Sequence, residues 1–181
     1  MEIKTNRLLF RTYEEKDAER LMAIADNKNI AWNMTDAFPY PCTLEKVREC
    51  IKDLSSLEKR DKNFVIIFEG EIVGCIGFRL KDGFREGSAS GECWIGEDYW
   101  GKGIGTEGWD ALVDYIFGDF DVRKISVGTF SWNIASIKIL DKCGFTEEGC
   151  IESELVRFGK VCNECRYGLL KSEWEVLKNK I

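Results

Sequence analysis

Tyr99-Trp100-Gly101-Lys102-Gly103-Ile104-Gly105-Thr106 separates a strand-like run, residues 90–95, from a helix-like run that follows it. In the second run, Trp109, Leu112, Val113 and Ile116 recur at the spacing of one face of an amphipathic helix. Glycines at every second position let a backbone approach a ligand closely, and a helix N-terminus behind them attracts anions. The segment therefore predicts a phosphate-binding loop, to which Lys102 adds a positive charge.

Two other glycine motifs fit this loop less well. Residues 103–108 match the G-x-G-x-x-G dinucleotide pattern, but the next predicted strand, 124–130, does not end in the acidic residue that would bind a ribose. A P-loop needs Ser or Thr after Gly-Lys, whereas Gly103 follows Lys102. A glycine-rich turn without a ligand stays open as the alternative.

A second segment, residues 133–145, favours a ligand-binding loop. It runs from Asn133 through Ser136 to Gly144-Phe145, and this spacing resembles that of the GNAT N-acetyltransferases. The loop resembles their acetyl-CoA motif, with Trp100 in place of the usual Gln or Arg. Its Trp-Gly-Lys-Gly-Ile-Gly form, together with the ending at 167–174, resembles the RimJ/RimL branch of ribosomal-protein N-terminal acetyltransferases. The resemblance extends from about residue 7 to residue 174.

The rest of the chain reads as alternating strands and helices. Hydrophobic periodicity and turn residues predict strands at 8–11, 64–68, 72–79, 90–95, 124–130, 147–157 and 161–170. Helices are predicted at 15–27, after Thr43 as N-cap, after the glycine loop, and at 134. We expect a mixed, mostly antiparallel α/β sheet with one parallel pair. The resemblance implies the GNAT acyl-CoA N-acyltransferase fold, with that pair splayed and one domain over 1–181.

Composition favours a cytoplasmic protein without metal. The chain has 181 residues, no apolar run near the roughly 20 residues of a membrane span, and an N-terminus without a signal-peptide core. It contains eight cysteines and no histidine. Cys162 and Cys165 form a lone Cys-x-x-Cys, and their side chains would point to opposite faces of a strand. We therefore expect no zinc and reduced thiols.

The resemblance assigns the binding of acetyl-CoA, the co-substrate, to two groups of residues. Backbone groups of Cys93, Trp94 and Ile95 would meet the pantetheine arm and the thioester carbonyl. The pyrophosphate would lie on the N–H groups of Gly101, Lys102, Gly103, Ile104, Gly105 and Thr106. Asn133 would contact the pantetheine arm, although an N-cap role for it is equally sound.

The reaction implied is direct attack of an amine on the thioester, without a covalent enzyme intermediate. Many GNAT enzymes have a tyrosine as general acid where this chain has Leu140, so Ser136 is the candidate donor to the departing thiolate. A solvent-facing role for this serine is the alternative. Glu92 and Glu154 are the candidate bases, and a solvated strand carboxylate is the alternative for each. Related enzymes often carry a glutamate at the position of Ser90.

The net charge of the chain limits the chemical classes of acceptor that it would bind. A net charge of −6 disfavours nucleic acid and favours a cationic amine. Protein N-termini, polyamines and aminoglycosides all qualify. About one α-amine in ten is neutral at pH 7, which makes an N-terminal acceptor the least demanding. The resemblance places Trp32, Phe38 and Tyr40 where GNAT enzymes vary to build the acceptor pocket, and a role in the core or in a lid is the alternative for them. No membrane partner is expected, and a homodimer is compatible with the family.

Two other classes of function stay open at this point. The chain could be a CoA-binding regulatory module without catalysis, because the general-acid tyrosine is missing. It could also be an interaction protein in which the glycine loop is only a turn.

Overall fold

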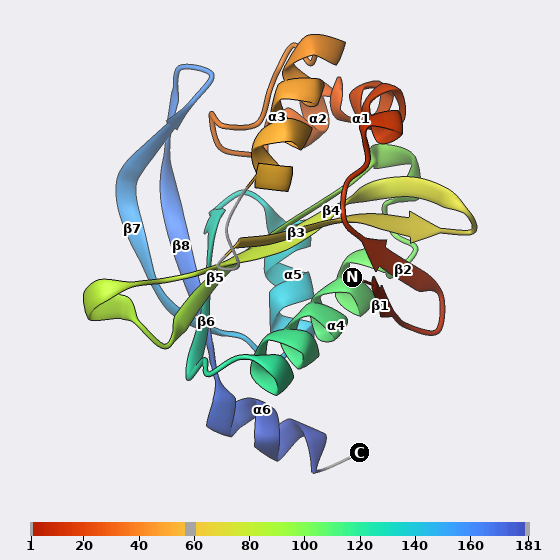
Figure 1. The fold of residues 1–181 in the computed structure, drawn as a ribbon. Coiled ribbons are helices and arrows are strands. Elements are labelled where there is room, and N and C mark those ends of the chain that lie inside the picture. The colour runs from red at the N-terminus through yellow and green to blue at the C-terminus, as the bar shows by residue number, and fades with distance from the viewer. Residues whose placement is uncertain (1, 57–60, 180–181) are drawn as a thin grey trace.

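The computed structural model describes residues 2–56 and 61–179, and within them eight strands form one sheet in the order β1-β2-β3-β4-β5-β6-β8-β7 (Figure 1). Neighbouring strands are antiparallel except for the parallel pair β5–β6. The strands are β1 (Glu2–Lys4), β2 (Leu8–Arg11), β3 (Asp61–Phe68), β4 (Glu71–Leu80), β5 (Ser88–Ile95), β6 (Lys124–Phe130), β7 (Thr146–Arg157) and β8 (Lys160–Leu170).

Helices cover both faces of this sheet. They are α1 (Ala18–Ala25), α2 (Lys28–Ala31), α3 (Leu44–Ser56), α4 (Ile104–Asp119), α5 (Ile134–Lys142) and α6 (Lys171–Lys178). In Figure 1, α1, α2 and α3 gather at the top, while α4 and α5 lie below the sheet and α6 lies at the bottom. Burial on both faces explains why β4 reads as a continuous apolar run, with residues 72–78 all buried.

Two hydrophobic cores result, one on each face. The larger core packs α4 and α5 against the sheet, and its α4 members include Trp109, Leu112 and Ile116. The smaller core packs α1 and α3 against β3 and β4, with Leu21 and Val47 among its members. The apolar face predicted for the helix after the glycine loop is therefore confirmed as buried.

The predicted elements are present, and the structure adds β1, α2 and α6 together with 3-10 turns at Gly83–Arg85 and Glu97–Tyr99. β1, α2 and α6 were not predicted from the sequence, because each is too short to show a clear period. The helix expected at 15–27 is a 3-10 turn (Glu15–Asp17) that leads into α1. Thr43 caps α3 as predicted, since its Oγ accepts the Lys46 N–H at 3.3 Å.

The expectation of reduced thiols is wrong for one pair of cysteines. Cys150 on β7 lies directly opposite Cys165 on β8, and the structure joins them as a disulfide. The register of two strands places these side chains together, and spacing along the chain does not reveal it. The other cysteines are free thiols: Cys42, Cys50, Cys75, Cys93, Cys143 and Cys162.

Candidate active site

The glycine loop joins β5 to α4 and has the backbone shape of an anion-binding turn. Gly101 and Gly103 both have positive φ angles, +75° and +77°, which side chains rarely tolerate. Gly103 is the N-cap of α4, and its carbonyl accepts the Glu107 N–H at 3.0 Å. The N–H groups of residues 104–106 precede that first helical bond, so they have no partner within the helix.

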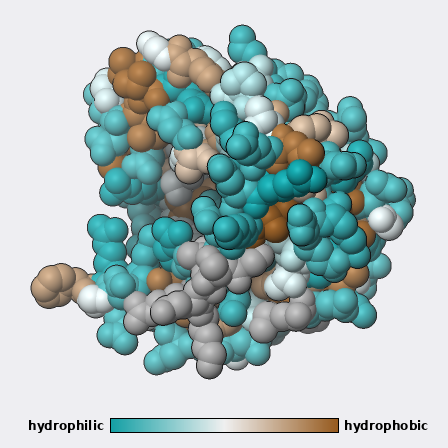
Figure 2. All heavy atoms as spheres, turned by 45° about the horizontal axis from the view of Figure 1, so that its top comes forward, coloured by the Kyte–Doolittle hydropathy of each residue, from teal (hydrophilic) through white to brown (hydrophobic). Residues whose placement is uncertain are grey.

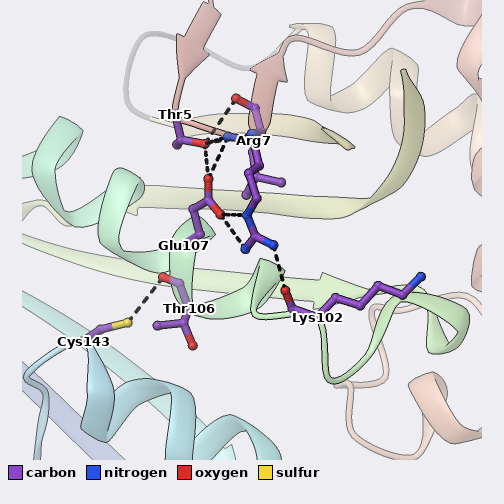
Figure 3. A network of polar contacts seen from close by, with 7 residues as sticks. Thr5, Arg7, Lys102, Thr106, Glu107 and Cys143 are labelled. Carbon is purple, nitrogen blue, oxygen red and sulfur yellow. Dashed lines mark hydrogen bonds and ion pairs between the residues drawn. The ribbon is translucent and has the colours of Figure 1, made fainter. Parts of the chain in front are cut away.

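Gly105 has a different role from the other two glycines. It is buried in the first turn of α4, where a Cβ would lie 2.7 Å from Ile139 Cδ1 of α5. The space where a Gly105 side chain would lie is therefore occupied by α5. Only the backbone N–H of Gly105 is part of the loop. The Thr106 carbonyl faces the same helix, since Cys143 Sγ approaches it at 3.6 Å (Figure 3).

Trp100 and Lys102 hold the loop at its edges. The Trp100 indole N–H donates to the Ile95 carbonyl at 2.7 Å, which ties the loop to the end of β5. The Lys102 side chain extends away from the polar network of Figure 3, and its Nζ lies 4.9 Å from the centre of the Tyr99 ring. Its charge stays at the protein surface.

The parallel strands β5 and β6 separate beside this loop. They pair only over residues 88–90 and 124–126, although β5 continues to Ile95 and β6 to Phe130. Over residues 93–95, β5 still pairs with β4 on its other edge. An extended polar chain could therefore add to the open edge of Cys93, Trp94 and Ile95, as a strand adds to a sheet.

Cys93 is not a reactive nucleophile in this gap. Burial, with a smaller effect of the nearby Glu92 carboxylate, raises the pKa of its thiol to about 12. The thiol therefore stays protonated at neutral pH, and the thiolate is the nucleophilic form.

Asn133 and Ser136 stand at the start of α5, just after β6. The Asn133 side chain is the N-cap of this helix, and its Oδ1 accepts the Ser136 N–H at 3.2 Å. The N-cap alternative is thus realised, and it leaves the amide NH2 of Asn133 and the Ser136 hydroxyl for other partners. Both side chains are half-buried.

A cavity of about 290 Å³ opens on the other face of the sheet, between α1, α3 and the strands. Glu92 and Trp94 line it from β5, since residues two apart in a strand share a face. Its described lining includes the carboxylates of Glu92 and Asp53 and no lysine or arginine. Glu92 is exposed on β5, but the neighbouring protein atoms still desolvate its carboxyl in part and raise its pKa, while Arg79 acts in the opposite direction.

The two candidate bases are placed differently. Glu92 lines the cavity, and the open edge of β5 continues from the same strand segment. Glu154, which is exposed like Glu92, lies on β7 where the pairing with β8 is interrupted between residues 151 and 155. It is not among the residues that line the cavity.

The aromatic residues expected at the acceptor side are divided between two hollows. Phe38 lines the 290 Å³ cavity and packs edge-on against Trp94, with ring centres 5.5 Å apart. Tyr40 lines a neighbouring hollow of about 620 Å³ together with Phe158. Trp32 stacks between Trp132 and Phe158, with ring centres 5.1 and 5.8 Å apart. It is not among the residues that line either hollow.

Two residues of this region could not be identified as part of the site from the sequence. Tyr13 lines the cavity, and burial raises the pKa of its hydroxyl well above the usual value, with Cys75 the next cause. Arg157, at the tip of the β7–β8 hairpin, donates two hydrogen bonds to the Ala31 carbonyl, at 3.0 and 2.6 Å, and one to Asp36. Neither belongs to a motif, so only the packing of distant segments reveals them.

The surface above α1–α3 is mostly hydrophilic, with separate hydrophobic groups (Figure 2). One such group stands at the upper left, on the side where Figure 1 places the tip of the β7–β8 hairpin. Val156, Phe158 and Val161, which lie at or next to that tip, are exposed apolar residues. Residues 2–56 and 61–179 contain no cluster of side chains able to hold a metal ion, and no helix among them is long and apolar enough to cross a bilayer.

Comparison with known proteins agrees with this arrangement. Residues 7–146 match the acetyltransferase (GNAT) domain family. The chain is 29% identical to the uncharacterized N-acetyltransferase p20 of Bacillus licheniformis, over 94% of this chain and 96% of the relative. It is 27% identical to the putative ribosomal N-acetyltransferase YdaF of Bacillus subtilis, over 93% of each chain.

The fold also matches solved structures. RimL, a ribosomal L7/L12 alpha-N-protein acetyltransferase in complex with coenzyme A, superposes with a TM-score of 0.85 at 20% identity, over 94% of this chain and 98% of that one. The glycine loop before α4, the separated strand pair and the family match agree. The chain belongs to the GNAT family of acetyltransferases, which use acetyl-CoA as co-substrate.

Proposed function

We propose that this N-acetyltransferase transfers the acetyl group of acetyl-CoA to the α-amine of a protein N-terminus, by direct attack in a ternary complex. The observation that carries the proposal is the gap between β5 and β6. It lies between the glycine loop at its end and the cavity that Glu92 and Trp94 line on the α1–α3 face. Donor and acceptor could therefore meet along one strand segment, residues 92–95.

On the donor side, the N–H groups of residues 101–106 would hold the pyrophosphate. The pantetheine arm would lie along the open edge of residues 93–95, with the Asn133 amide as a side-chain contact. Backbone N–H groups of that edge would stabilise the tetrahedral oxyanion, and such preorganised donors contribute about 3–4 kcal/mol each. The high pKa of the Cys93 thiol supports direct attack over an acyl-enzyme.

Proton movements complete the reaction. The neutral amine nitrogen attacks the thioester carbonyl carbon and loses a proton to Glu92, directly or through water. The C–S bond then breaks, and the Ser136 hydroxyl stabilises the CoA thiolate with a hydrogen bond and relays a proton from water to it, so that the hydroxyl itself is regenerated. Glu92 suits the first step because its carboxyl pKa is raised towards the working pH.

The cavity chemistry supports a cationic acceptor. The Glu92 carboxylate attracts an ammonium group, and the rings of Phe38 and Trp94 offer an apolar wall beside it. YdaF and RimL, whose names refer to ribosomal acceptors, favour a protein N-terminus. A polyamine is the second candidate, because a spermine/spermidine N(1)-acetyltransferase of Bacillus subtilis is 26% identical over 59% of this chain.

Thiol release in the presence of acetyl-CoA tests the proposal. Acceptors would be a basic peptide with a free N-terminus, the same peptide with a blocked N-terminus and a free lysine, spermidine and an aminoglycoside. We expect turnover with the free N-terminus and an acetyl group on its α-nitrogen by mass spectrometry. Turnover with spermidine or the aminoglycoside alone would contradict the N-terminal assignment. Binding of acetyl-CoA without turnover on any amine would instead favour a regulatory module.

A further inference from the structure

The turn between β1 and β2 reaches across to the glycine loop through one side chain, Arg7 (Figure 3). Its guanidinium donates to the Lys102 carbonyl at 3.0 Å and to the Glu107 carboxylate from Nε at 2.7 Å. A second guanidinium nitrogen lies 2.6 Å from the same carboxylate. These contacts join residues about 100 positions apart, so they belong to the tertiary structure alone.

The bond to Lys102 sets the direction of a neighbouring N–H group. In a trans peptide the carbonyl and the following N–H point in opposite directions. Since Arg7 holds the Lys102 carbonyl, the Gly103 N–H must point away from Arg7. Gly103, which completes this peptide, and Gly101, one residue before Lys102, both have positive φ and no side chain, so the loop backbone alone restrains the direction of the peptide weakly.

The contact with Glu107 pairs Arg7 with a negative charge in the first turn of α4. A carboxylate there is attracted by the helix N-terminus and would oppose an incoming phosphate. Arg7 holds it on the β1–β2 side, together with the Thr5 hydroxyl at 2.5 Å and the Arg7 backbone N–H at 3.0 Å. The negative charge is therefore neutralised and turned to the side of the loop that faces β1 and β2.

We propose that Arg7 is a positioning residue for the acetyl-CoA pyrophosphate, because it orients the Lys102–Gly103 peptide and neutralises Glu107. This inference rests on the assignment of the glycine loop in the proposed function. Arg7 acts through the loop backbone. The planar guanidinium group, with several N–H donors, is needed for this role as well as the positive charge. A lysine offers one point of donation and could not bond the carbonyl and the carboxylate in the same way.

The test compares two acyl donors, acetyl-CoA and S-acetylpantetheine, which lacks the pyrophosphate. For Arg7→Ala we expect the KM for acetyl-CoA to rise about tenfold, with kcat and the KM for the amine within twofold. Arg7→Lys should show most of the same rise in the KM for acetyl-CoA. With S-acetylpantetheine, kcat/KM should be within twofold of wild type for both variants.

Two further variants keep the outcome decisive. Lys178→Ala is the matched control, because Lys178 forms an ion pair with Asp114 near the far end of α4 at similar exposure. Gly101→Val strains the loop itself, where a Cβ meets no other atom within 4 Å. Thermal unfolding of each variant without ligand would show whether the fold is intact.

Several results would overturn the inference. These are an acetyl-CoA KM unchanged in Arg7→Ala, a wild-type KM in Arg7→Lys, or an equal loss with S-acetylpantetheine. If Gly101→Val lowers the preference for acetyl-CoA and Arg7→Ala does not, only the role of Arg7 fails. If Gly101→Val leaves that preference unchanged, the assignment of the loop to the pyrophosphate fails as well.

Discussion

Glu92 brings two functional requirements together at one position of β5. Its side chain lines the cavity on the α1–α3 face, while the backbone of the next three residues forms the open edge beside β6. Although the side chain is exposed, partial desolvation by the surrounding protein raises the pKa of its carboxyl above the ordinary 4.5. A base is most effective when its pKa approaches the working pH, provided that it is still ionised there. This residue therefore fits the role better than Glu154.

Glu92→Gln should lower kcat by about 100-fold, the lower range for loss of a general base. In the wild type, kcat at saturating amine should rise with pH through the raised pKa of Glu92, because only the carboxylate accepts a proton. That acid limb should be absent from the pH profile of the variant. Glu154→Gln serves as the comparison, and a larger loss there would reverse the assignment.

Ser136→Ala should lower kcat by about 10- to 100-fold, with both KM values within twofold, because the hydroxyl serves only the departing thiolate. Ser136→Thr keeps a hydroxyl and should retain much of the rate. Steady-state kinetics with acetyl-CoA measures both. An unaltered kcat in the alanine variant would remove the serine from the mechanism.

At the scale of elements, the position of the glycine loop depends on how α4 packs against α5. Gly105 in α4 lets Ile139 of α5 approach to within 2.7 Å of the place where a Cβ would stand. The start of α4 is thus set by a helix contact, and the loop N–H groups move with it. The same helix α5 carries Asn133 and Ser136 at its N-terminus.

Gly105→Val should lower the free energy of unfolding by about 1–3 kcal/mol, since overpacking forces the helices apart. The acetyl-CoA affinity should fall as well. Adding Ile139→Ala to Gly105→Val should restore part of both losses. Urea unfolding of the wild type, the two single variants and the double variant measures the coupling energy between the two positions. Strictly additive losses would show that the two side chains do not meet.

Across the whole molecule, the tip of the β7–β8 hairpin is joined to the segment that precedes α3. Arg157 is buried and makes three hydrogen bonds to that segment, two of them to the Ala31 carbonyl. It also covers Phe158 at 4.3 Å. The C-terminal hairpin and the N-terminal helices thereby enclose the hollow beside the cavity that Glu92 lines.

Arg157→Ala should lower the free energy of unfolding by about 1–3 kcal/mol, because a buried carbonyl loses its donors. The amine KM should rise while the acetyl-CoA KM stays within twofold, since the change lies on the acceptor side only. Arg157→Lys is the charge-matched control and should recover part of the stability. A rise in the acetyl-CoA KM instead would place this contact on the donor side.

Much of this arrangement was predictable from local sequence. The helix face of α4, the β3–β4 hairpin and the Thr43 cap follow from periodicity and turn chemistry, because their contacts lie within a few residues. The family followed from two glycine-containing segments whose spacing is specific together. Short elements and the Cys150–Cys165 pair could not be predicted in this way. Their stability or pairing depends on strands and helices that pack together from afar.

The sequence by itself determined the longer strands and helices and their order, the glycine loop, and the side chains that are candidates to donate or accept protons. Those properties are local, since hydrophobic period, glycine conformation and side-chain chemistry do not require the rest of the chain. Only the tertiary structure decided which carboxylate faces the cavity, which glycine packs against α5, and that Arg7 meets Lys102 and Glu107. Each of these depends on strand register or helix packing, which brings together residues that no local pattern connects.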